Sequence, residues 1–178
     1  MATAHDRKIL NRILNPLMPD EDPTEEKVAE DEQIDHPEYA KSRQLEKEAI
    51  ALAEGGNIAK ALEKFDEAIE VCPVNPSAFN NRAQAHRLNS ETEKAMSDLD
   101  MALELSEGKG KSGCQAFVQR ALIRRLNGDD QGAKADYEKA AALGSSFAKM
   151  QLVALNPYAA MCNKMLSEVM QNLREGKE

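Results

Sequence analysis

The sequence predicts an all-α protein built from three consecutive copies of a helix–turn–helix unit. The chain aligns on itself without a gap when residues 53–73 are placed over residues 87–107, at an offset of 34, and residues 87–107 align over residues 125–145 at an offset of 38. Hydrophobic residues make up 42% of the chain and aromatic residues only 4%, without Trp, which is typical of helices packed through small and aliphatic side chains.

Three positions hold alanine in every copy, and they are expected where helices cross. They are Ala49, Ala83 and Ala121; Ala61, Ala95 and Ala133; and Ala68, Ala102 and Ala140. A methyl group lets two helix axes approach closely, whereas a larger side chain overpacks the crossing. A bulky residue follows the second alanine by four positions, which puts both on one helical face. The bulky residues are Phe65, Leu99 and Tyr137.

The boundaries follow from this alignment. The repeats are placed at residues 42–75, 76–109 and 114–147, and the array as a domain is assigned to residues 42–145, where the internal alignment ends. Each repeat is expected to hold two helices of about thirteen residues. Gly56 and Gly128 are expected at the turns between paired helices. Asn75 and Pro76 provide a cap and a first-turn proline for the second repeat. The additional residues before the third repeat fall in EGKGKSG, residues 107–113, whose glycines predict a lengthened turn.

Three further segments flank the repeats. Residues 1–18 carry an amphipathic stripe and are predicted to form a helix that docks on the array or on a partner. Residues 19–40 are predicted to be an acidic linker, because residues 19–38 hold ten acids and one lysine; it is a solvated spacer or a lure for a basic partner surface. Residues 146–178 are predicted to form a capping helix and a long C-terminal helix with a methionine-rich face, which is buried as core or binds a partner.

Charged residues also recur from repeat to repeat. Arg82 and Arg120 each precede an aspartate by sixteen residues, Asp98 and Asp136 respectively, and Glu48 and Lys64 hold the same slots in the first repeat with the signs exchanged. We predict one structural ion pair in each repeat, joining its two helices. The alternative interpretation is that the arginines bind a ligand.

The spacing of alanines and bulky residues resembles the tetratricopeptide repeat. With ILNRILNP near the start, the acidic linker and LNPYAAMCNKML after the repeats, nearly the whole chain is similar to the tetratricopeptide repeat protein thirty-six family, also named as a binding protein of the seventy-kilodalton heat-shock chaperone. The family's Trp, Leu-Gly and Tyr positions are not matched. The resemblance implies a small cytosolic chaperone adaptor, and the family has also been associated with tyrosine catabolism.

Polar residues of the inner helices are the candidate partner-binding groove. These are Arg43, Asn80, Asn81, Gln84, Arg87, Gln115, Gln119 and Arg125. Many chaperone-binding repeat domains grip the carboxylates of an acidic partner tail with a clamp of Lys, Asn and Arg. The resemblance places the clamp slots at Glu46, Ile50, Asn81, Gln115 and Gln119. Only Asn81 matches, and Glu46 would repel a carboxylate, so a chaperone is expected to bind in another way.

The sequence contains no motif typical of a catalytic site. There is no glycine-rich phosphate loop, and His5, His36 and His86 have no Cys or Ser at motif spacing. The cysteines, three in number and far apart, form no metal-binding pattern and favour the cytosol. We therefore expect a monomeric, non-enzymatic adaptor without metal, cofactor, nucleic acid or membrane, whose partner is a heat-shock chaperone or a client enzyme. The alternative is self-association through the methionine-rich C-terminal helix.

Overall fold

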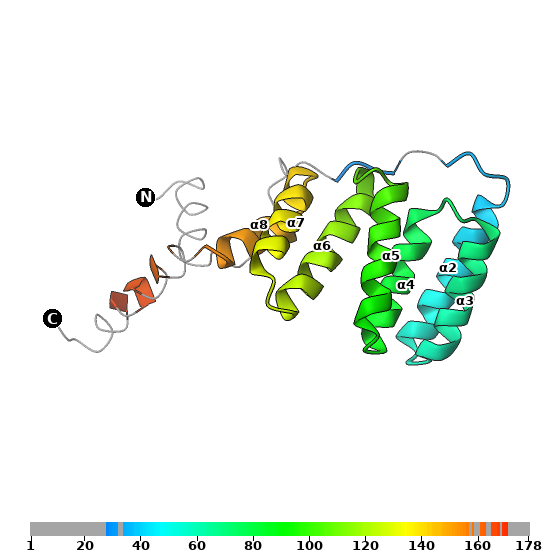
Figure 1. Cartoon of the computed structure of the whole chain (residues 1–178), viewed down its shortest axis with the longest axis horizontal. Helices are drawn as coiled ribbons and strands as arrows, with labels where there is room; N and C mark the ends of the chain where they lie inside the picture. The colour runs from blue at the N-terminus through cyan, green and yellow to red at the C-terminus, as the bar shows by residue number, and fades with distance from the viewer. Residues whose placement is uncertain are drawn as a thin grey trace, which may run out of the picture.

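The computed structural model describes residues 28–31, 34–156, 158, 161–162, 165–167 and 169–170. Seven helices with defined bounds follow one another in this part of the chain, and it contains no strand (Figure 1). They are α2 (Tyr39–Glu54), α3 (Ile58–Val71), α4 (Pro76–Leu88), α5 (Thr92–Leu105), α6 (Gly110–Leu126), α7 (Asp130–Ala142) and α8 (Ser146–Ala154). The predicted all-α class is confirmed, and α8 packs on α7 as the capping helix was expected to do.

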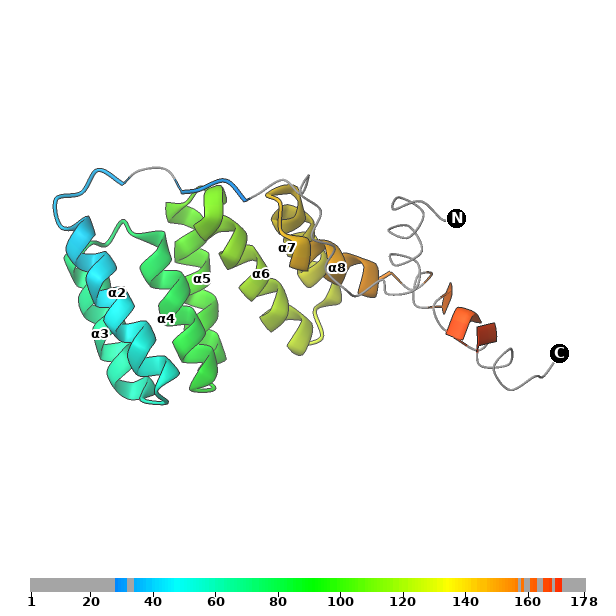
Figure 2. The same ribbon diagram turned by 180° about the vertical axis from the view of Figure 1, so that it is seen from behind.

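The helices form three antiparallel pairs, α2–α3, α4–α5 and α6–α7, stacked side by side (Figures 1 and 2). In addition, α2 contacts α4 and α4 contacts α6, so these three helices line one row of the array. All nine repeated alanines are at most 1% exposed, and so are Phe65, Leu99 and Tyr137. The close crossings expected from the alanine pattern are therefore present in every repeat.

The glycine-rich segment before the third repeat differs from its prediction. It does not lengthen a turn, because α6 begins at Gly110 and residues 110–113 form its first turn. A Cβ on Gly113 would lie 2.6 Å from the backbone carbon of Gly108, so glycine lets the helix start against the preceding turn. Gly110 itself has a φ of +62°, a conformation that other residues rarely adopt.

The acidic linker also differs from its prediction. Its last residues already belong to α2, which begins at Tyr39, and the part before it, residues 28–31 and 34–38, is a strap that runs back along one end of the helices (Figures 1 and 2). The Asp31 carboxylate accepts hydrogen bonds from the backbone N–H of Ser112 at 2.7 Å and from its hydroxyl at 2.6 Å. Val28 packs against the cluster formed by α6, α7 and α8. The strap is therefore docked on the repeats and is not a solvated spacer.

The ends of the chain are described only in part. The amphipathic residues 1–18 lie outside the described residues. The described residues beyond 157 are helical, and none of them is buried; the large apolar side chains there, from Tyr158 to Met170, are 44–74% exposed. The expectation that this methionine-rich face is core is wrong for these residues, because no other described element covers them. No helix in the described part of the chain is long and apolar enough to cross a lipid bilayer.

Candidate functional site

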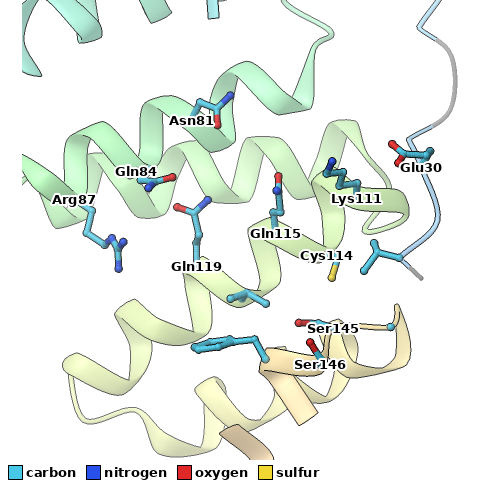
Figure 3. A pocket seen from close by; sticks show the side chains of 14 residues that line it. Glu30, Asn81, Gln84, Arg87, Lys111, Cys114, Gln115, Gln119, Ser145 and Ser146 are labelled. Carbon is cyan, nitrogen blue, oxygen red and sulfur yellow. The ribbon is translucent and has the colours of Figure 1, made fainter. Parts of the chain in front are cut away.

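A cavity of about 540 Å³ lies between α4, α6 and the turn that leads from α7 into α8 (Figure 3). The strap forms part of its wall through Val28 and Glu30. The remaining lining residues are Asn81, Gln84, Arg87, Lys111, Cys114, Gln115, Val118, Gln119, Gly144, Ser145, Ser146 and Phe147. A second, smaller hollow of about 150 Å³ between α2 and α4 shares Asn81 and Gln84 with it. The two hollows therefore adjoin along α4.

Helical spacing explains why these polar groups share one surface. Asn81, Gln84 and Arg87 follow one another at three-residue intervals on α4, and Lys111, Gln115 and Gln119 follow at four-residue intervals on α6. Residues three or four apart lie on the same face of a helix. Because α4 contacts α6, the two faces line the same cavity.

Several of these side chains keep their hydrogen-bonding capacity unused. Within the described chain, Gln84, Arg87, Lys111 and Gln115 make no side-chain hydrogen bond or ion pair, and the Nε of Arg87 is buried without a partner. A buried donor without a partner costs free energy, which a ligand that accepts the hydrogen bond would recover. The cavity thus presents amide and cationic donors suited to binding a polar or acidic group.

The structure brings together five of the eight predicted groove residues: Asn81, Gln84, Arg87, Gln115 and Gln119 all line the cavity. The other three predicted residues do not line this cavity, and their side chains are bonded to other parts of the chain. Arg43 donates to Glu46 and Ser77, and Arg125 donates to Gln151 of α8. Asn80 is 1% exposed and donates to the backbone carbonyl of Ser112, so it joins α4 to α6 inside the array.

Other cavity residues were missed by sequence reasoning. Val28 and Glu30 belong to a segment whose composition indicated a free linker, and Lys111 belongs to a segment whose glycines indicated a turn. Ser145, Ser146 and Phe147 come from the start of the capping helix, and no periodic signal connected them with the groove. The four-residue spacing of Lys111, Gln115 and Gln119 would have pointed to Lys111, had residues 110–113 been assigned to the helix.

Glu46, at the first of the clamp positions, is held in a network of hydrogen bonds within the chain. Glu46 is 1% exposed and accepts hydrogen bonds from Asn75 at 2.6 Å, Ser77 at 2.7 Å, Asn81 at 2.8 Å and Arg43 at 3.0 Å. The Nδ2 of Asn81 also lies 3.5 Å from the hydroxyl of Ser77. The amide of Asn81, which alone matches the clamp pattern, is therefore already bound to a carboxylate of its own chain.

Two of the three predicted ion pairs are formed. Arg82 donates through Nε and Nη2 to both oxygens of Asp98, at 2.8 and 2.6 Å. Arg120 does the same to Asp136, at 2.9 and 2.8 Å. These hydrogen bonds raise the pKa of both guanidinium groups, and each arginine also lies over the ring of the phenylalanine three residues before it. Both arginines therefore tie helices together and are not free for a ligand.

The prediction is wrong for the first repeat, where Glu48 and Lys64 are not paired. Lys64 bonds to Glu67 at 2.6 Å, and Glu48 accepts a hydrogen bond from Gln44 at 3.2 Å. Partners three or four residues away on the same helix are always within reach, so they compete well at an exposed position. Glu48 is exposed, and it gains little from reaching across to the paired helix.

The cavity carries no arrangement of reactive groups. Cys114 lines it, but burial raises the pKa of this thiol, which disfavours the nucleophilic thiolate. Among the described residues, no group of three His, Cys, Asp or Glu side chains is placed to hold a metal ion. What the geometry offers is recognition through hydrogen bonds and charge.

Comparison with known proteins places the whole chain beside a set of curated relatives. It is 62% identical over 179 residues to tetratricopeptide repeat protein 36 of Caenorhabditis elegans, with 100% of both chains covered. It is 50% identical to the protein of that name from Danio rerio, covering 98% of this chain and 96% of the relative. The human protein of that name is 43% identical over 187 residues, covering 100% and 99%. No family model matches the chain.

Solved structures agree with the repeat architecture. The first tetratricopeptide domain of Spaghetti (RPAP3), bound to the HSP90 peptide SRMEEVD, aligns with a TM-score of 0.60 at 22% identity, over 71% of this chain and 99% of that one. The Sgt2 domain from Aspergillus fumigatus aligns with a TM-score of 0.59 at 25% identity, over 78% and 86%. The all-α tetratricopeptide solenoid is thereby shown.

Proposed function

The chain belongs to the tetratricopeptide repeat protein 36 family, and we propose that it acts as an adaptor that holds a segment of a partner protein in the cavity between α4, α6 and α8. Proteins built from tetratricopeptide repeats are in general interaction modules without catalysis. The observation that carries the proposal is the convergence of Asn81, Gln84, Arg87, Gln115 and Gln119 on one cavity, where the side-chain donors of Gln84, Arg87 and Gln115 have no partner among the described residues.

Chaperone association is the finer part of this proposal. Solved domains of the same fold are bound to chaperone peptides, as in the second RPAP3 domain with the HSP70 peptide SGPTIEEVD. In this chain the clamp slots differ, and Asn81 is bound to Glu46. We propose that a heat-shock chaperone, if it is the partner, is contacted through the cavity and not through its terminal carboxylate. We further propose that the clients of this adaptor are metabolic enzymes of the cytosol, including those of tyrosine catabolism.

The experiment is a quantitative co-purification with the full chain and two matched arginine variants. Arg87→Glu places a negative charge in the cavity, whereas Arg125→Glu changes an exposed arginine outside it. We expect partner recovery to fall at least tenfold for Arg87→Glu and to stay within about twofold for Arg125→Glu. Equal recovery with both variants would show that the cavity is not the binding surface. Recovered chaperones and enzymes of tyrosine catabolism are quantified separately.

Self-association is a second candidate, favoured by the exposed apolar face of the C-terminal helix. Met161, Met165 and Val169 are each more than half exposed. Exposed apolar side chains that gather on one face often mark an interaction site. Sedimentation of the full chain and of a chain ending at Asn156 tests this: concentration-dependent dimers that disappear on truncation would favour it, whereas a full chain that stays monomeric would exclude it.

A further inference from the structure

Arg87 differs from the other arginines in the described chain. Arg43, Arg82, Arg120 and Arg124 each lie within 4 Å of a carboxylate, and Arg125 is bound to Gln151. Within the described chain, the Arg87 side chain contacts neither a carboxylate nor an amide oxygen. It is nevertheless half-buried, and its Nε is inaccessible to water. An arginine in that state is not explained by stabilisation of the fold, because it forms no bond that holds elements together.

Among the described residues, Lys111 is a second cation without an ion-pair partner, and it lies at the opposite end of the same cavity. The helices α4 and α6 run parallel, since each is antiparallel to α5 between them (Figure 1). Arg87 is in the last turn of α4 and Lys111 in the first turn of α6, so they lie towards opposite ends of the groove. Figure 3 shows Gln84, Gln119 and Gln115 between them. The groove therefore carries a positive charge towards each end with amides in the middle, and Glu30 of the strap adds one carboxylate to the wall near Lys111 (Figure 3).

We propose that this groove takes an extended internal segment of the partner, with one carboxylate for Arg87 and a second for Lys111; the assignment rests on the proposed function of the cavity. Guanidinium and ammonium groups without a counter-ion are matched by carboxylates through charge-assisted hydrogen bonds. Gln84 and Gln115 can both donate to and accept from a peptide backbone. Val118 and the partly exposed Phe147 offer contact for an apolar side chain between the two acids.

The helix geometry sets the spacing of the two acids. Arg87 corresponds to position 125 of α6, because the second and third repeats are offset by 38 residues. Positions 111 and 125 are roughly 21 Å apart along a helix that rises ~1.5 Å per residue. An extended chain spans that distance in roughly six residues. A free C-terminus is not required, since the Asn81 amide that could bind one is occupied by Glu46.

The test is a selection from a random peptide library displayed on phage, with each peptide of about twelve residues joined to the coat protein at its C-terminus, so that no free C-terminal carboxylate is present. The bait is the full chain, as wild type, Arg87→Gln, Lys111→Gln and the control Arg125→Gln. We expect wild type and Arg125→Gln to enrich peptides with two acids roughly six residues apart. Each cavity variant should lose the preference at one acid, and selected peptides should bind it about tenfold more weakly.

The outcomes separate this inference from the proposed function. Enriched peptides without acids, or acids retained in both cavity variants, would overturn the inference and leave the groove as a binding site. Failure to enrich any peptide would overturn both. The other possible occupant is the acidic stretch of this chain before Val28. If a full chain with Asp20, Glu21, Asp22, Glu25 and Glu26 replaced by amides binds the selected peptides tenfold more tightly, this stretch is the occupant and the assignment to a partner is overturned.

Discussion

The carboxylate of Glu46 and the amide of Asn81 lie 2.8 Å apart and join α2 to α4 inside the row of helices that lines the groove. Glu46 is 1% exposed, so it is not a surface charge that repels a ligand from a distance. It is an internal acceptor that uses the donor which a partner's terminal carboxylate would need. This hydrogen bond is the basis of the expectation that the groove does not use a partner's terminal carboxylate.

The first prediction concerns such a tail. We expect the peptide SRMEEVD, seen bound to a repeat domain of the same fold, to bind this chain with the same affinity whether its C-terminus is free or amidated. The reason is that Asn81 is already bonded to Glu46 and the other clamp slots lack cations. Titration calorimetry of both peptide forms measures this. A free carboxylate that tightens binding tenfold would contradict the assignment.

The second prediction concerns the pair of Arg82 and Asp98. The Asp98 side chain is 7% exposed and that of Arg82 is 20% exposed, so removing the arginine leaves a nearly buried carboxylate without its partner. We expect Arg82→Ala to lower the free energy of unfolding by about 3 kcal/mol, at the lower end of the range for buried pairs. Urea denaturation measures the loss, and a double-mutant cycle with Asp98→Ala isolates the coupling.

The control for this cycle is Glu48→Ala in the first repeat. Glu48 occupies the slot equivalent to Arg82, but it is exposed and unpaired with Lys64. Its removal should change the free energy of unfolding by less than about 0.5 kcal/mol. Equal losses for Arg82→Ala and Glu48→Ala would show that the bidentate pair contributes nothing specific to stability.

The third prediction concerns the strap. Asp31→Ala removes the acceptor of the Ser112 amide at the start of α6, an interaction equivalent to a helix cap. We expect a loss of about 1 kcal/mol in the free energy of unfolding. Hydrogen exchange at the Ser112 amide should also become faster, whereas Asp35→Ala, which changes an exposed acid of the strap, should leave that rate unchanged. Unchanged exchange in Asp31→Ala would mean that the strap is not held by this bond.

The fourth prediction concerns the acid range. Hydrogen bonds from Lys94, Asn89 and His86 lower the pKa of Glu91 from its ordinary 4.5 to about 2. Because the pKa is lower in the folded state, ionised Glu91 stabilises the fold above pH 4.5, and this contribution is lost as the pH falls towards 2. A carbon-detected NMR titration of the carboxyl should show the low pKa, and Lys94→Ala should raise it. A midpoint near 4.5 in the wild-type chain would refute the assignment.

The sequence by itself determined the repeat architecture. Ala95 or Leu99 can be assigned to a helix crossing from periodicity alone, because a repeated contact imposes the same size limit in each copy. The ion pair of Arg82 and Asp98 could also be predicted from the sequence, because both residues recur at one spacing on helices that must pack together. Five of the groove residues could be found because inner helices present every third or fourth residue to one surface.

The tertiary structure decided which hydrogen-bonding groups of these side chains remain available for a ligand. Asn80 and Asn81 are neighbours in the sequence, yet one joins helices inside the array and the other lines the cavity while bonded to Glu46. Asp31 caps a helix 81 residues further along the chain, a contact that no local pattern encodes. Periodicity specifies which face of a helix a residue occupies. Only the packed chain specifies which donors find internal partners, and within its described part the buried Nε of Arg87 finds none.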